Sequence, residues 1–191
     1  VTAQLLPDGG ALLENDFLRV ELSAQGELNS LYSKTLEREA LAEGQTGNQL
    51  WLFEDRPLVW DAWDIEAYIE DRSEHLDTEA KITLVSSGPL RAEIYVERQM
   101  RSSVWRQTIR LDYDSLRLDF ITQVQWYEQH CLLKVAFPVD VLAQEAFYQI
   151  QFGHIARPTH ANISWDAAKF EVAAHAWADL REDGFGVALF N

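Results

Sequence analysis

Apolar and polar residues alternate with a period of two along most of the chain, which is the spacing of β-strands. The alternation is clearest in residues 18–22, 90–97 and 105–111, and it continues through the longer run 116–126. Short polar side chains at 112–115 can hydrogen-bond to their own backbone, which favours a turn between two of these segments. The pattern therefore predicts antiparallel strands joined by short turns.

Four later segments show the same strand pattern: 133–137, 148–152, 170–178 and 186–191. Pro138 and Gly153 close the first two of these segments. Only residues 35–43 are weakly helical, and strands and helices do not alternate. We therefore expect an all-β fold, a large antiparallel β-sandwich of two big sheets packed face to face. The run 186–191 is either the last edge strand of a sheet or a strand of a larger chain interrupted in mid-course.

The composition adds limits on the partners of this fold. The chain has 191 residues, of which 47% are hydrophobic and 25% charged, as in a packed globular domain. Lys and Arg total 16 against 31 Asp and Glu, so the net charge is −15. Such a surface repels phosphate backbones and anionic lipids, and we expect neither nucleic acid nor a membrane as partner. The single cysteine, Cys131, forms no internal disulfide, which favours a reducing, cytoplasmic compartment.

A first candidate site lies in residues 53–64, where two indoles, four carboxylates and one guanidinium occur together. Sugars are bound by this mixture, because the C–H face of a pyranose packs on an aromatic ring while charged groups bind its hydroxyls. The candidate residues are Asp55, Trp60, Asp61, Trp63 and Asp64. In the alternative interpretation, the two tryptophans fill the core beneath a loop and the acids face water.

A second candidate site is the polar and aromatic stretch 152–166, which lies between two apolar segments. Connections of this composition often display functional groups on a rigid scaffold. The candidate residues are Arg157, His160, Asn162, Trp165 and Asp166. The alternative is a long structural connection whose Asn and Asp bind backbone groups and whose Arg157 pairs with a surface acid.

Neither stretch predicts a catalytic or metal centre. The five histidines include no His-x-x-x-His pair with a Glu, and one cysteine excludes a thiolate zinc site. There is no Gly-x-Ser-x-Gly motif, and the sequence does not single out a pair of catalytic carboxylates among its acids. We therefore assign no catalytic and no metal-binding residue to this chain.

Several motifs together resemble glycoside hydrolase family 38 α-mannosidases. In chain order they are 14–20, 48–57 (NQLWLFEDRP), 60–64 (WDAWD), 152–166 and 169–186. The run at 60–64 resembles the cytosolic or bacterial branch of the family. The resemblance spans nearly the whole chain and implies that residues 1–191 are part of a C-terminal β-sandwich domain, a supersandwich of the galactose mutarotase type, truncated from a larger multidomain chain.

The resemblance also implies what this chain lacks. In the family, an α/β barrel carries the nucleophile and the zinc ligands, and a helical bundle follows it; both are absent here. We expect no cofactor in this segment and zinc in the missing catalytic domain of a retaining α-mannosidase. The expected partners are that barrel, a mannose-containing saccharide and further copies of the chain in a homo-oligomer. The isolated segment should be inactive.

Three other functions remain open at this point. The chain could be a free-standing carbohydrate-binding module, a purely structural or assembly domain, or an aldose epimerase suggested by the fold analogy alone. The ten candidate residues would then bind sugar, lock the sandwich onto the barrel, or serve only the fold.

Overall fold

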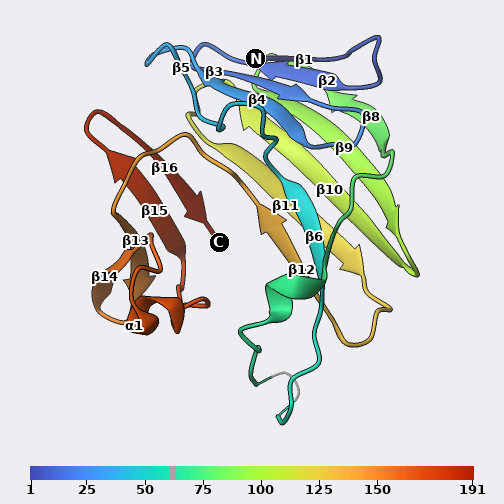
Figure 1. Cartoon of the computed structure of the whole chain (residues 1–191). Coiled ribbons are helices and arrows are strands. Elements are labelled where there is room, and N and C mark those ends of the chain that lie inside the picture. Colours follow the sequence, from blue (N-terminus) through green and yellow to red (C-terminus); the bar gives the residue numbers. More distant parts are fainter. Residues whose placement is uncertain (61–62) are drawn as a thin grey trace.

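The structure, a computed structural model, describes residues 1–60 and 63–191 and consists of antiparallel strands (Figure 1). In these residues the strands form four sheets. The first sheet has the order β1-β2-β3-β4-β5, with β1 (Thr2–Leu5), β2 (Ala11–Glu14), β3 (Leu18–Leu22), β4 (Leu28–Ser33) and β5 (Arg38–Glu39). The second has the order β11-β10-β9-β8, with β8 (Lys81–Ser86), β9 (Arg91–Met100), β10 (Ser103–Asp112) and β11 (Leu118–Gln125).

The main core lies between these two sheets. Leu13, Val20 and Leu22 of the first sheet pack against the cluster that contains Ile94 and Ile109 of the second, and all five are fully buried or nearly so. Along β9 and β10 every second residue is buried, as the period of two requires when one face of a sheet meets the core. This alternation explains why the two strands are so clear in the sequence.

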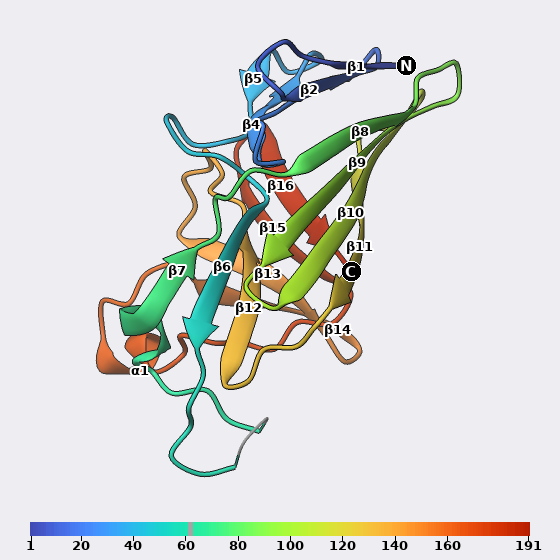
Figure 2. The same ribbon diagram turned by 90° about the vertical axis from the view of Figure 1, so that its right-hand side faces the viewer.

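A third sheet covers the part of the buried face of the second sheet that the first sheet leaves open. It has the order β12-β6-β7, with β6 (Gln49–Glu54), β7 (Ser73–His75) and β12 (Cys131–Ala136), and the 3-10 helix η1 (Ile69–Arg72) leads into β7 (Figure 2). Leu50, Leu52 and Leu76 form a second buried cluster with Met100 and Trp105 of the second sheet. The first and third sheets together thus form the layer opposite the second sheet.

The fourth sheet is only lightly attached to this sandwich. It has the order β14-β13-β15-β16, with β13 (Glu145–Ile150), β14 (Gly153–Pro158), β15 (Trp177–Glu182) and β16 (Phe185–Phe190), and the short helix α1 (Ser164–Ala167) lies between β14 and β15 (Figure 1). Arg38 of β5 forms an ion pair with Glu182 at 2.6 Å, and its guanidinium lies 4.1 Å from the ring centre of Phe185. Lys134 of β12 pairs with Glu171.

The all-β antiparallel fold is confirmed, with the strands divided among four sheets instead of two. The weakly helical segment 35–43 is not a helix. Glu39 accepts hydrogen bonds from the backbone N–H groups of Leu31, Ala40 and Leu41, and β5 pairs with β4. These bonds satisfy the backbone in an extended form, which outweighs a weak helix propensity.

Two predicted strands have different ends. The strand expected at 170–178 begins only at Trp177, because the alanine-rich sequence before it has little strand propensity. Immediately before the strand, His175 N–H donates to the carbonyl of Gln149 at 3.0 Å. The strand expected at 148–152 ends at Ile150, and Phe152 lies in the following turn with a φ of 64°. The strand expected at 186–191 is confirmed as β16.

Candidate functional site

The first candidate stretch forms a loop between β6 and η1 that extends away from the sheets (Figure 1). The side chains of Trp60 and Trp63 are 73% and 88% exposed, so the interpretation that they fill the core is wrong. The backbone N–H of Trp63 donates to the carbonyl of Trp60 at 2.9 Å, and the N–H of Leu58 donates to Glu66 Oε1 at 3.0 Å. The loop therefore presents two indoles to solvent on a locally hydrogen-bonded backbone.

The carboxylates of this loop differ in their surroundings. Asp55 is half-buried, and its N–H donates to the carbonyl of His130 at 2.8 Å. Asp64 is exposed, and its Oδ1 accepts from the N–H of Ile65 at 3.0 Å. Asp61 lies outside the described residues.

Ion pairs hold the root of the loop. Glu54, the last residue of β6, binds Arg56 at 2.6 Å and Arg72 of η1 at 2.7 Å. The hydrogen bond from Arg72 holds the pKa of Glu54 below its ordinary value, and Arg56 adds to the effect. One carboxylate thus joins the outgoing and the returning side of the loop.

Sequence reasoning missed a buried polar group beneath this root. Glu27 is 4% exposed and accepts a hydrogen bond from Thr46 at 2.7 Å, and His75 Nε2 lies 2.7 Å from its other oxygen. The ring of His75 stacks on Trp51, with centroids 4.9 Å apart. Because His75 belongs to the strand that follows the loop, these contacts fix where the chain re-enters the sheet. No local pattern marks this pair, which is 48 residues apart in sequence.

The second candidate stretch runs from the end of β14 through α1. Arg157 lies with its guanidinium 5.8 Å from the ring centre of Tyr148, and its Nε is buried without a hydrogen-bond partner among the described residues. His160 Nδ1 lies 3.6 Å from Asp166 Oδ2, and the side chain of Asp166 is 12% exposed. Asn162 and Trp165 are exposed. The structure thus brings His160 and Asp166 together and leaves Asn162 and Trp165 facing solvent.

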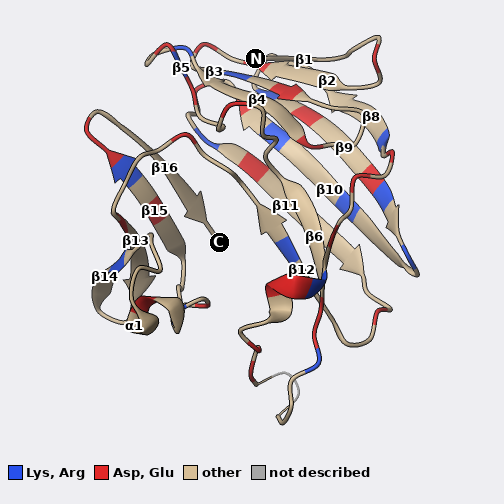
Figure 3. Cartoon of the chain, viewed as in Figure 1, with Lys and Arg blue, Asp and Glu red and all other residues tan. Residues whose placement is uncertain are grey.

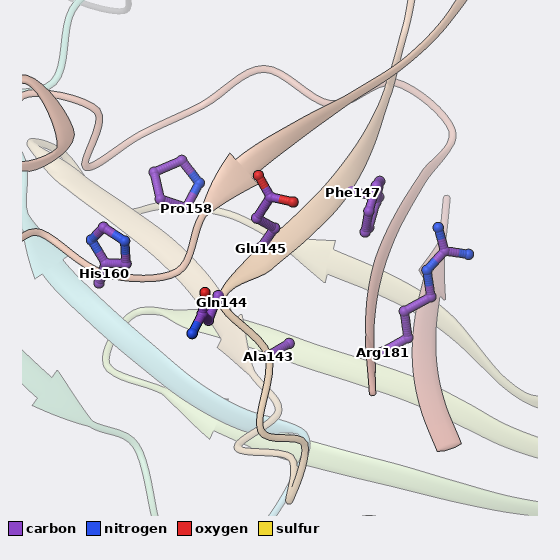
Figure 4. Close-up of a pocket in the computed structure, with 7 residues that line it drawn as sticks. All are labelled: Ala143, Gln144, Glu145, Phe147, Pro158, His160 and Arg181. Atoms are coloured by element: carbon purple, nitrogen blue, oxygen red, sulfur yellow. The ribbon is translucent and has the colours of Figure 1, made fainter. Parts of the chain in front are cut away.

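His160 also lines an open hollow of about 370 Å³ at the edge of the fourth sheet (Figure 4). Its lining residues are Ala143, Gln144, Glu145, Phe147, Pro158, His160 and Arg181. The guanidinium of Arg181 lies 4.3 Å from the ring centre of Phe147. A hollow lined by a carboxylate, an imidazole, an amide and a guanidinium suits a small polar, hydroxyl-bearing molecule. Of the predicted residues only His160 lines this hollow.

The two candidate stretches are not joined by any hydrogen bond, ion pair or ring contact within residues 1–60 and 63–191. The loop with Trp60 and Trp63 belongs to the third sheet, and α1 belongs to the fourth (Figure 1). They are therefore two separate candidate sites.

The charged residues of the second sheet form ion pairs away from the two candidate stretches. Acidic residues of β9 form ion pairs with basic residues of β10, Glu97 with Arg106 at 2.7 Å and Glu93 with Arg110 at 3.0 Å (Figure 3). In the described part of the chain, no three His, Cys, Asp or Glu side chains are placed to hold a metal ion. The family resemblance implies zinc in another domain of the parent protein, and these side chains are not expected to bind it. The described residues include no helix long and apolar enough to cross a membrane.

Comparison with known proteins defines the class. A family model described as "Glycosyl hydrolases family 38 C-terminal domain" matches residues 13–191, so the chain belongs to this family. The resemblance seen in the sequence motifs is confirmed.

Individual relatives refine the class. The chain is 46% identical to "Alpha-mannosidase 2C1" of Homo sapiens over 96% of its own length, and 41% identical to "Alpha-mannosidase G" of Dictyostelium discoideum over 96%. It spans 18% and 17% of those two proteins, so it corresponds to a fraction of their length. Among solved structures, an alpha-mannosidase from Enterococcus faecalis V583 shares the fold with a TM-score of 0.77 at 14% identity, covering all of this chain and 24% of that one.

Proposed function

We propose that this chain is the non-catalytic β domain of a retaining α-mannosidase that removes terminal α-linked mannose in the cytoplasm. The domain packs on the catalytic barrel of its own polypeptide and places the loop of Trp60 and Trp63 at the rim of the substrate site. The proposal is supported by membership of the family and by relatives named alpha-mannosidase, of the 2C1 type among others. The nucleophile and the zinc ligands then belong to other parts of the parent protein.

The exposed tryptophan loop is the observation that carries the proposal. Trp60 and Trp63 are 73% and 88% exposed, although indoles are among the side chains that gain most from leaving water. Each ring can pack on the C–H face of a pyranose, while the exposed carboxylate of Asp64 accepts hydrogen bonds from the sugar hydroxyls. The ion pairs of Glu54 with Arg56 and Arg72 hold the two ends of the loop together. A loop that is already restrained loses less conformational entropy when it binds a sugar.

Two variants of the full-length protein separate a sugar contact from an interface contact. Trp63→Ala removes an exposed ring, and we expect kcat/KM on an aryl α-mannoside to fall roughly 10- to 100-fold with an unchanged melting temperature. Leu58→Ala is the matched control, because Leu58 is as exposed in the same loop but offers no ring for stacking. It should leave kcat/KM within about twofold.

The opposite results assign another role. If both variants lower the melting temperature and leave kcat/KM unchanged, the loop locks the sandwich onto the barrel and the rim proposal is wrong. If saccharide changes the tryptophan fluorescence of this chain by itself, the domain acts as a free-standing carbohydrate-binding module. If neither variant changes activity or stability, the loop serves neither role and the domain is structural.

A further inference from the structure

The last strand, β16, is an edge strand without the usual protection of an edge. It is the last strand in the order of the fourth sheet in the described residues, on the side of that sheet nearer the other strands in Figure 1. Its sequence, FGVALF, has six residues and contains no charged residue and no proline, and its pairing with β15 has no bulge. Natural edge strands are shortened, charged, bulged or interrupted by proline, because an open edge offers unpaired N–H and C=O groups to other chains.

The other edge strands of the described chain carry these protections. In the fourth sheet the opposite edge, β14, contains Arg157 and Pro158. In the second sheet β8 begins at Lys81 and has a register shift, and β11 contains Asp119. In the first and third sheets the edges β1, β5 and β7 have four residues or fewer, and β12 contains Lys134. Only β16 is both long and free of any such device within residues 1–60 and 63–191.

The side chains of β16 are apolar on both faces of the sheet. Leu189 and Phe190 point to opposite faces, because neighbouring residues of a strand alternate, and they are 55% and 65% exposed. A continuous apolar run is typical of a strand that is covered on both faces inside a sheet. The composition of β16 thus fits an interior position, whereas its surroundings here are those of an edge.

The hydrogen-bond pattern shows which backbone groups of β16 are open. Asn191 N–H donates to the carbonyl of Ala176 at 2.8 Å, immediately beyond the paired strands. In an antiparallel pair every second residue turns both its N–H and its C=O toward the partner. Val187 and Leu189 therefore face β15, whereas the amides of Gly186, Ala188 and Phe190 point away from it. The same alternation applies to β14, where Thr159 N–H donates to the carbonyl of Gln144. Pro158 therefore faces the open edge of β14, where no hydrogen bond is lost because proline has no N–H.

We propose that in the parent protein a further strand of the same polypeptide pairs with β16 along this open edge and helps to cover Leu189 and Phe190. This chain spans 18% of its relative in Homo sapiens, and its fold occupies 24% of the Enterococcus faecalis chain, so proteins that contain this domain have ample further sequence. A strand of the same polypeptide pairs at high effective concentration. A second copy is disfavoured, because each copy brings a net charge of −15. The proposal does not depend on the proposed function.

Residue-resolved hydrogen exchange on the full-length parent protein tests this pairing. The outward amides of Gly186, Ala188 and Phe190 should exchange as slowly as the inward amides of Val187 and Leu189, on the order of a hundredfold slower than open backbone. Exchange of the outward amides at the rate of open backbone overturns the proposal. Protection that disappears on dilution, together with a dimer, also overturns it, because the occupant is then a second copy.

A matched pair of proline variants gives a second readout in the full-length protein. Ala188→Pro removes an outward amide of β16, and Ala156→Pro removes an outward amide of β14, the edge that already contains a proline. If a strand pairs with β16, Ala188→Pro lowers the melting temperature by several degrees more than Ala156→Pro. Equal effects of the two variants contradict the pairing. The exchange experiment uses the natural sequence, so it remains decisive if a proline variant does not fold.

Discussion

At the scale of single residues, Gly26 shows how one position joins a turn to the core. It has a φ of +77° and closes the turn in which its N–H donates to the carbonyl of Ser23 at 2.9 Å. A Cβ atom on Gly26 would lie 2.5 Å from Cγ1 of Val96, a core residue of the second sheet. The side chain of Asn48 donates to the carbonyl of Gly26 at 3.2 Å. The position therefore requires both a left-handed backbone and the absence of a side chain.

Substituting this glycine tests the two requirements together. Gly26→Ala should lower the free energy of unfolding by about 2–4 kcal/mol, since backbone strain adds to overpacking against Val96. Gly44→Ala is the matched control: Gly44 has a φ of +72°, and a Cβ atom added there would meet no other atom within 4 Å, so only the strain of about 1 kcal/mol remains. Urea denaturation of both variants measures the difference, and equal losses would show that contact with Val96 does not matter.

At the scale of elements, a small set of polar contacts at β5 helps to attach the fourth sheet, in addition to the ion pair of Lys134 with Glu171. Arg38 pairs with Glu182 at 2.6 Å and donates to the carbonyl of Asp140 at 2.6 Å. The same Glu182 accepts a hydrogen bond from the N–H of Leu142 at 2.6 Å. These bonds hold the segment that leads into β13 against the end of β15. Such contacts are salt-sensitive and weaker than the apolar packing between the first two sheets.

The stability contributed by Glu182 should depend on pH. The hydrogen bond from Leu142 and the charge of Arg38 hold the pKa of Glu182 below its ordinary value of 4.5. A carboxyl group whose pKa is lowered by folding stabilises the protein above its unfolded pKa, and this contribution is lost as the pH falls through the folded pKa. The natural protein should therefore be more stable than Glu182→Gln at pH 7, and the difference should shrink as the pH falls below 4.5 and vanish once the pH is below the lowered pKa of the folded protein. Denaturation of both proteins from about pH 7 to about pH 3 measures this, and a constant difference would contradict it.

The strands and the segment 35–43 also show where a local sequence pattern is sufficient to predict secondary structure. The strands β3, β9 and β10 are predicted correctly because one face of each is buried and the other is not. The segment 35–43 is not, because its extended form depends on the pairing of β5 with β4 and on the side chain of Glu39. Long-range partners decide the conformation of these residues, and a local pattern contains no information about them.

At the scale of the whole molecule, the chain combines a well-packed sandwich with a fourth sheet that has much exposed apolar surface. The first core cluster contains thirteen buried residues from the first two sheets and their connections, whereas in β13–β16 only Ala146 and Phe185 are buried. A domain with this distribution suits burial within a larger protein. That property agrees with the share of its relatives that the chain spans.

An activity assay on this chain and on the full-length parent tests the proposal that the catalytic site lies outside this chain. The 191-residue chain alone should release no product from an aryl α-mannoside, whereas the full-length parent should do so. A chelator should reduce the activity of the parent and leave thermal unfolding of this chain unchanged, because none of its described side chains form a metal site. Circular dichroism checks that the short chain is folded in the assay. Product release by the short chain would show that it contains its own catalytic site.

The sequence by itself determined the β-class of this protein, most strand positions and the family, because alternation along a strand and ordered motifs are local properties. It also identified Trp60 and Trp63 as unusual, but only the tertiary structure decided that they face solvent instead of the core. Likewise, the pairing of Glu27 with His75 and the open edge of β16 arise from the order of strands in the sheets. Burial and pairing depend on residues far apart in the chain, so only the folded arrangement determines them.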